Sequence, residues 1–204
     1  MSLPLYAAFV LAVIALMLIP GPNVALIVAN AMARGPRAGL ATMAGTTAAM
    51  LPQLALTGLG MSALIAGAAE AFAILRWLGV AYLVFLAYRA FTAPADDLSG
   101  VAPERAPLRR LFLRGFLVSC SNPKTLVFIA AFFPQFIAPA APVGPQVLML
   151  SATFIALAVV IDSGWVLLAS RVGGVLRMSG RLRNRLTGSL LLGAGLGLAL
   201  ARKP

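Results

Sequence analysis

The sequence predicts an all-α membrane protein with six transmembrane helices, arranged as two inverted three-helix repeats with broken first and fourth helices. Three observations lead to this prediction. Of the 204 residues, 61% are hydrophobic and only 10% are charged, a balance outside the usual range of soluble domains. Six long apolar stretches follow one another along the chain. Prolines interrupt the first and fourth stretches at positions 22 and 123, which are 101 residues apart.

The apolar stretches run at about residues 5–31, 38–66, 72–88, 111–137, 146–170 and 186–201. Six spans of about 20 residues each use about 120 residues, so residues 1–204 form a single transmembrane domain. Repeat 1 covers about residues 1–91, a cytoplasmic linker about 92–110, and repeat 2 about 111–204. The first stretch is longer than a signal peptide, and neither lysine nor arginine precedes it.

The distribution of positive charge predicts the orientation of these spans, because lysine and arginine near span ends stay on the cytoplasmic side. Twelve arginines follow the first, third and fifth spans, whereas Arg76, Arg202 and Lys203 lie on the opposite side. Both termini are therefore expected outside the cytoplasm. The twelve are Arg34, Arg37, Arg89, Arg105, Arg109, Arg110, Arg114, Arg171, Arg177, Arg181, Arg183 and Arg185.

Composition also excludes several classes of protein. The formal charge of +11 does not indicate nucleic-acid binding, because the basic residues mostly fall between apolar runs and form no contiguous face. Cys120 is the only cysteine and histidine is absent, which excludes an intramolecular disulfide and a histidine-ligated metal site. We expect no cofactor, no metal and no catalytic residues.

The two proline segments predict breaks in the first and fourth spans. Pro20-Gly21-Pro22-Asn23 lies in the first and Asn122-Pro123-Lys124 in the fourth. A proline removes a backbone donor and interrupts helix geometry, and in lipid the freed groups must face protein or a water-filled cavity. Asn122 followed by Pro123 is typical of a helix start, and Gly21-Pro22 is similar. Two helix starts aimed at the membrane centre would attract carboxylates. The alternative is that both prolines merely kink packed helices.

Lys124 and Asp162 are the only ionisable residues near the middle of predicted spans. Burying either charge alone is costly, so each is expected to pair or to face water. In one interpretation they form a fixed ion pair that never touches substrate. In the other, Lys124 adds positive charge beside the helix starts and Asp162 receives an ammonium group or a coupling proton. Both interpretations place them in the bundle interior.

The second span adds uncharged polar candidates. Gln53, beside Pro52, has an amide that needs partners in lipid, whereas Thr46 and Thr47 are weaker candidates because threonines commonly bond to their own helix. The predicted substrate-binding residues are Pro20, Gly21, Pro22, Asn23, Gln53, Asn122, Pro123, Lys124 and Asp162.

The two proline segments also resemble segments of a known protein family. Together with Arg34-Gly35, Trp77-Leu78-Gly79 and the run from Phe132 to Phe136, the two proline segments resemble the lysine exporter and threonine/homoserine efflux family over nearly the whole chain. The resemblance implies a bacterial inner-membrane exporter of amino acids or close derivatives, driven by the proton gradient and assembled as a homo-oligomer. Many relatives have an acidic or imidazole side chain in the second span, where this chain has Gln53. Asp162 is therefore the expected proton-coupling residue.

The sequence is compatible with three classes of function. The first is a secondary exporter that works by alternating access around a midplane site. The chain has no GxxxxGK[ST] loop, so nothing in it indicates nucleotide hydrolysis. The second is a channel-like facilitator, or a scaffold without transport. The third is an intramembrane enzyme in which Lys124 and Asp162 do acid–base work, but no nucleophile–base motif supports it. A small zwitterion suits both charged residues. The sequence does not indicate which side chain this zwitterion carries.

Overall fold

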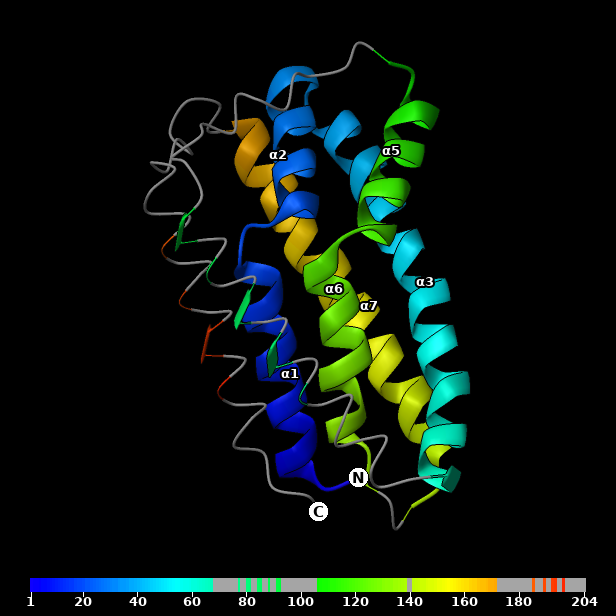
Figure 1. Ribbon diagram of the computed structural model, residues 1–204. Helices are drawn as coiled ribbons and strands as arrows, with labels where there is room; N and C mark the ends of the chain where they lie inside the picture. Colours follow the sequence, from blue (N-terminus) through cyan, green and yellow to red (C-terminus); the bar gives the residue numbers. More distant parts are fainter. Residues whose placement is uncertain are drawn as a thin grey trace.

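The computed structural model describes residues 1–67, 106–138 and 141–171, together with isolated positions between 77 and 92 and between 185 and 196. Most of the predicted spans at 72–88 and 186–201 and most of the linker at 92–110 lie outside the described residues. Within them every regular element is a helix (Figure 1). The elements are α1 (Leu3–Leu18), α2 (Pro22–Arg34), α3 (Pro36–Gly67), α5 (Leu108–Cys120), α6 (Pro123–Val127), the π-helical turn η2 (Phe128–Phe132), the 3-10 turn η3 (Phe133–Phe136) and α7 (Val143–Arg171).

The all-α class is confirmed for the described residues, and four predicted spans coincide with helices. The stretch at 5–31 corresponds to α1 and α2, and the stretch at 38–66 corresponds to α3. The stretch at 111–137 runs from α5 to η3, and the one at 146–170 is α7. Boundaries differ by a few residues because polar residues such as Arg34 and Arg171 continue each helix beyond its apolar part.

Length and hydropathy identify the elements that qualify as membrane spans. Among the described helices, α7 qualifies alone, with a mean hydropathy of 2.0 over its most apolar window. The pair α1–α2 and the pair formed by α5 with Pro123–Phe136 also qualify if each is one span, although they bend by 53° and 49°. The described residues therefore contain one to three candidate spans by this criterion.

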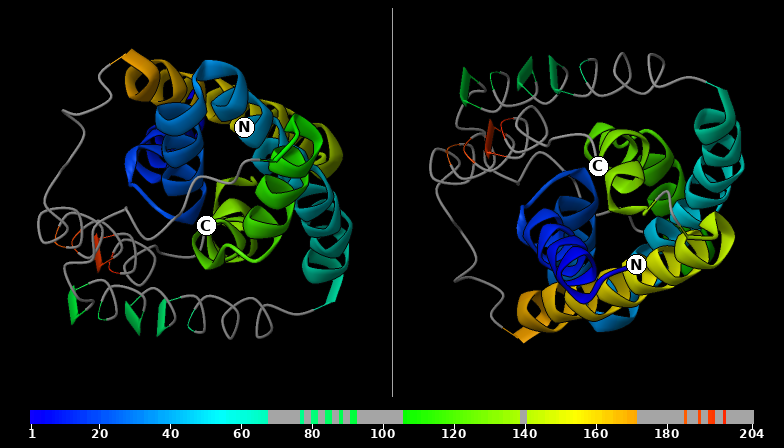
Figure 2. Two further views of the ribbon diagram at one scale, coloured as in Figure 1. Left: turned by 90° about the horizontal axis from the view of Figure 1, so that it is seen from above. Right: turned by 90° about the horizontal axis from the view of Figure 1, so that it is seen from below.

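The two bent pairs run in opposite directions along the bundle. In Figure 1, α1 and α2 run upward from the N-terminus, whereas α5 and α6 run downward. The elements that follow them, α3 and α7, also run in opposite directions. Seen along the bundle axis, α3 lies beside α5, and α7 runs beside α1 and α2 (Figure 2). The two breaks thus lie at about the same height in the interior.

Two apolar clusters fill the interior, one on each side of the breaks. The larger, on the side of the N-terminus, contains Phe9, Phe128, Phe133 and Phe154. Its aromatic rings form two edge-to-face pairs, one stacked pair and one tilted pair, with centroids 5.2–5.7 Å apart. The smaller cluster joins α2 to the last turns of α7 and consists of Val24, Ile27, Val28, Ala31, Val166 and Ala169. Apolar packing therefore closes the interior both above and below the breaks.

Large apolar side chains are also exposed on the outside of the bundle. Leu11 on α1, Leu56 on α3, Leu117 on α5 and Val160 on α7 all face outward with more than half of their surface accessible. A soluble monomer rarely exposes apolar side chains on so many neighbouring elements. This surface fits a hydrocarbon environment, in which the helices satisfy their own backbone groups.

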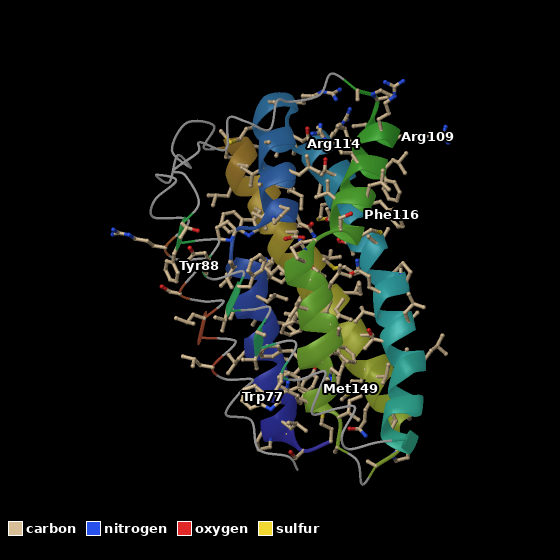
Figure 3. The ribbon with its side chains drawn as sticks, in the orientation of Figure 1. Trp77, Tyr88, Arg109, Arg114, Phe116 and Met149 are labelled. Atoms are coloured by element: carbon tan, nitrogen blue, oxygen red, sulfur yellow. The ribbon has the colours of Figure 1, made fainter. Side chains whose placement is uncertain are left out.

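Four described arginines, Arg34, Arg109, Arg114 and Arg171, lie at one end of the bundle. Arg34 ends α2 and donates a hydrogen bond to the backbone oxygen of Ala106, just before α5 begins. Arg109 and Arg114 lie on the same end of α5 (Figure 3), and Arg171 ends α7 at that end too (Figure 1). The N-terminus of α1 lies at the opposite end. The orientation predicted from the sequence places this end on the cytoplasmic side.

Two glycines allow α3 and α5 to touch backbone to backbone. A Cβ atom added to Gly45 would lie 1.9 Å from the carbonyl oxygen of Phe112, and one added to Gly115 would lie 2.4 Å from that of Thr42. No real Cβ atom is accommodated at such distances, so only glycine permits this approach. The contact fixes α5, and with it the second break, against α3.

We expect Gly45→Ala to lower the thermal stability of the detergent-purified protein by about 3 kcal/mol, the upper end of the usual range for overpacking, because backbone cannot move aside as a side chain can. Differential scanning fluorimetry would measure the shift in apparent Tm. Gly60→Ala on the same helix is the matched control, since no atom of the described residues lies within 4 Å of its added Cβ. Equal Tm values for the two variants would contradict the close contact.

Candidate functional site

The first break separates α1 from α2 and exposes the backbone groups of both helix ends to the interior. The chain leaves α1 at Leu18, and Ile19 and Gly21 are extended. Pro22 is the first residue of α2, where its missing N–H costs no hydrogen bond. The carbonyl groups in the last turn of α1 have no partner within their own helix.

The second break has the predicted helix start. Asn122 is the N-cap of α6, and its Oδ1 accepts a hydrogen bond of 3.1 Å from the backbone N–H of Lys124. Pro123 occupies the first helical position. The predicted capping role of Asn122 is therefore confirmed. The chain continues from α6 through the π-helical turn η2, a feature that occurs frequently at functional sites.

Lys124 reaches from the second break to the first. Its Nζ donates hydrogen bonds to the carbonyl oxygens of Leu16 at 2.9 Å and Ile19 at 2.8 Å. Gly21 lies beside it, since an added Cβ would be 3.4 Å from Nζ. The ammonium group therefore caps the C-terminal end of α1, where the helix dipole also favours a cation.

Asp162 lies on α7 between the two apolar clusters, one turn from Ala158 on one side and from Val166 on the other. Only 2% of its surface is accessible. Lys124 attracts it electrostatically, but the described residues contain no hydrogen bond from the Lys124 ammonium to this carboxylate. Lys124 instead donates to backbone carbonyl groups that the break leaves without helical partners, so the fixed ion pair of one sequence interpretation is not formed between the described atoms.

Ser119, in the last turn of α5, connects the uncharged polar side chains of the site. Its hydroxyl oxygen accepts a hydrogen bond of 3.1 Å from Nδ2 of Asn23. Its carbonyl oxygen accepts from Nε2 of Gln53 at 3.0 Å and from the backbone N–H of Asn122 at 3.1 Å. Ser119 is fully buried. Three predicted residues from α2, α3 and the second break thus meet at Ser119, which was not among the residues predicted from the sequence.

The two breaks are joined by reciprocal contacts. Asn23 and Lys124 each follow the proline of their break, and they are 101 residues apart, as the two prolines are. Asn23 bonds to the last turn of α5, and Lys124 bonds to the carbonyl groups at the end of α1. Each half therefore stabilises the helix end that the other half leaves open.

Several buried polar atoms of the site have no hydrogen-bond partner among the described residues. At the breaks these are Oδ1 of Asn23, Oε1 of Gln53 and Nδ2 of Asn122. A buried unpaired polar atom costs about 1–3 kcal/mol, so three of them in one small region are unfavourable unless another molecule completes their bonds. Thr47 also has an unpaired hydroxyl, whereas Thr46 bonds to the carbonyl oxygen of Met43 in its own helix.

The structure brings most of the predicted site residues together. Asn23, Gln53 and Asn122 meet at Ser119, and Gly21 lies beside Lys124. Pro22 and Pro123 begin the two inner helices, and Pro20 lies within the first break. The arrangement can present charges of both signs and several neutral hydrogen-bonding groups to one small polar molecule.

Comparison with known proteins adds independent information. The family model described as LysE type translocator matches residues 14–202. The homoserine/homoserine lactone efflux protein of Salmonella typhimurium is 34% identical over 205 residues, covering 99% of each chain. An uncharacterized membrane protein of Vibrio cholerae is 30% identical over 204 residues, covering 99% of this chain and all of the relative. The leucine efflux protein of Salmonella typhimurium is 30% identical over 138 residues, covering 67% of this chain and 65% of the relative. No solved structure matches the chain.

Proposed function

Because the chain belongs to the LysE type translocator family, we propose that it exports amino acids or close derivatives across the bacterial inner membrane. The match covers nearly the whole chain, and relatives along its length are named for the efflux of homoserine, its lactone and leucine. Family membership also favours transport over the intramembrane enzyme considered above.

The observation that carries the proposal is the pair of joined breaks with buried charges of both signs. Lys124 uses two of its three N–H groups on the carbonyl oxygens of α1, which leaves one for a substrate carboxylate. The start of α2 at Gly21 and Pro22 lies beside this ammonium group and favours the same negative charge. Asp162 accepts the substrate ammonium group. A zwitterion therefore satisfies both ends of the site.

Transport then proceeds by alternating access around this site. The opposite directions of the two bent pairs support an inverted repeat, in which corresponding helices move against each other. The apolar clusters on the two sides of the breaks would open in turn. Asp162 exchanges a proton for the substrate ammonium group, which couples export to the proton gradient. The arginine-rich end faces the cytoplasm, both termini lie outside it, and the protein functions as a homo-oligomer.

Two measurements test this function. Metabolite profiling of the medium from overexpressing and deletion strains should show one or a few amino acids whose extracellular level follows expression of the protein. Counterflow of the same amino acid in proteoliposomes should then show exchange of labelled for unlabelled substrate, which a carrier performs and a channel does not. Unchanged medium and absent exchange for all amino acids would refute the proposal.

We expect Pro123→Ala to reduce export several-fold while leaving expression intact. Alanine is compatible with a first-turn position, so folding tolerates it, but the fixed φ of proline that sets the helix start is lost. Export assays normalised to membrane-inserted protein would measure the effect. Pro36→Ala is the matched control, because Pro36 also begins a helix but lies on the surface far from both breaks. Equal loss of export in both variants would show that the break has no special role.

A further inference from the structure

The start of α5 lies within a group of arginines that come from three helices. Arg34, the last residue of α2, donates a hydrogen bond to the carbonyl oxygen of Ala106, two residues before α5 begins. Ala106 also packs with Ala38 and Leu111, and this contact joins the first turn of α3 to the first turn of α5. The basic cluster assembled in this way consists of Arg34, Arg37, Arg109, Arg110 and Arg114. Figure 3 shows two of its members at the start of α5.

The described part of the protein offers no anion to the exposed members of this basic cluster. Arg37, Arg109 and Arg110 are all exposed. Among the described residues the only acidic side chain is that of Asp162, which is buried between the two apolar clusters in the interior. The first turns of α3 and α5 contain no acidic residue. Because neighbouring cations repel one another, the basic cluster favours an anionic partner from outside the described residues.

The outer face of α5 continues from these cations into apolar side chains. Leu113 and Leu117 follow Arg109 at intervals of four residues, so the three side chains lie on one face of the helix. The two leucines are 52% and 57% exposed. At a rise of about 1.5 Å per residue they lie about 6 and 12 Å from Arg109 toward the middle of the bundle. The opposite, buried face consists of Leu111, Gly115 and Ser119.

This order of charge and apolar surface matches an anionic phospholipid. The phosphate carries the negative charge at the polar end of the lipid, and guanidinium groups bind phosphate oxygens with two parallel hydrogen bonds. The acyl chains begin next to the phosphate and extend toward the middle of the membrane, where Leu113 and Leu117 lie. A soluble anion would contact the cations but leave the leucines uncovered. A zwitterionic phospholipid would cover the leucines but bring no net charge to the cations.

We propose that the basic cluster and the outer face of α5 form a binding site for an anionic phospholipid of the phosphatidylglycerol type. Arg109 and Arg110 bind the headgroup phosphate, and Leu113 and Leu117 contact an acyl chain. The site lies on the face of α5 opposite to Ser119, where Asn23 and Gln53 bond. It is therefore separate from the transport site, and it holds a lipid whatever substrate the protein exports.

Native mass spectrometry of the purified protein tests this site without any substitution. The protein in a neutral detergent would be offered an equal mixture of dioleoyl phosphatidylglycerol and dioleoyl phosphatidylcholine, which share their acyl chains and differ in net charge. We expect the protein to retain phosphatidylglycerol in excess. The excess should shrink as ionic strength rises, because salt screens exposed charges. Equal retention of the two lipids would overturn the proposal.

Single substitutions show whether the preference belongs to the basic cluster or to the whole arginine-rich end. Arg109→Gln and Arg110→Gln should each raise the dissociation constant of the first bound phosphatidylglycerol about fivefold, the usual contribution of one basic residue near anionic lipid. Arg171→Gln is the matched control, because Arg171 is exposed at the same end but belongs to α7. It should leave the constant unchanged. Equal effects of all three substitutions would mean general attraction to negative charge and would overturn the specific site.

Other occupants of the basic cluster would give different results. Displacement of phosphatidylglycerol by inorganic phosphate would show that the cluster binds a soluble anion. The linker contains Asp96, Asp97 and Glu104. If these residues occupied the cluster, the wild type would show no lipid preference, and the variant Asp96→Asn/Asp97→Asn/Glu104→Gln would gain one. Either result overturns the proposal. If a substituted protein does not fold, the headgroup preference of the wild type and its salt dependence decide alone.

Discussion

Replacing Lys124 by methionine is expected to abolish export and to destabilise the protein. The substitution leaves the carbonyl oxygens of Leu16 and Ile19 without their donor and leaves Asp162 buried without a nearby positive charge. Removing one partner of a buried charge interaction costs about 3–5 kcal/mol. Thermal unfolding in detergent and export by cells would measure the two effects separately.

The double variant Lys124→Met/Asp162→Leu distinguishes a structural role from a functional one. It removes the stranded charge, so part of the lost stability should return, while the two carbonyl groups stay unpaired and keep it below that of the wild type. Export should remain absent, because no charged group is left to bind the zwitterion. Recovery of export together with stability would show that Lys124 and Asp162 serve only to hold the fold.

Asp162→Asn is expected to uncouple transport from the proton gradient. Asparagine keeps the shape of the side chain and can still hydrogen-bond, but it does not take up or release a proton in the working pH range. The variant should exchange labelled for unlabelled amino acid but should not accumulate it against a gradient under an imposed proton-motive force. Proteoliposomes assayed in both modes would measure this.

The neighbouring Ser163→Ala is the control for Asp162→Asn. Ser163 contacts the sulfur of Met43 and lies on the same turn of α7, so its loss tests the effect of a small polar change at this depth. It should retain uphill transport. Uphill transport by a stable Asp162→Asn protein would remove Asp162 from the coupling mechanism.

The breaks were predictable from the sequence because proline acts locally. Its missing N–H and fixed φ interrupt a helix wherever it stands, and Asn122 before Pro123 is a capping signal that needs no tertiary information. Four of the predicted spans match helices for a similar reason, since the length of an apolar stretch bounds the helix that it can form.

The contacts between the breaks were not predictable in the same way. One interpretation of the sequence pairs Lys124 with Asp162, because a sequence displays side chains and a carboxylate is the side-chain partner that suits an ammonium group. The carbonyl groups of Leu16 and Ile19 that it contacts belong to the backbone, and every helix end has such groups whatever its residues.

Ser119 and the two close-contact glycines were missed for a related reason. Ser119 acts mainly through its backbone oxygen, which every residue has, and serine is common at helix ends. The one sequence signal for it is its position three residues before Asn122. In the sequence, nothing distinguishes Gly45 and Gly115 from the other glycines of the chain. Only the packing of α3 against α5 shows that these two positions require glycine.

Cys120 can report whether the transported amino acid binds at the two breaks. It is the only cysteine in the chain, it ends α5 at the second break beside Ser119, and it is half-buried. Its alkylation by N-ethylmaleimide can therefore be followed on the unaltered protein. We predict that the exported amino acid slows alkylation, with a half-effect concentration equal to its half-saturation in counterflow, and that an amino acid that is not exchanged has no effect. An alkylation rate that saturating substrate leaves unchanged would contradict a site at the breaks.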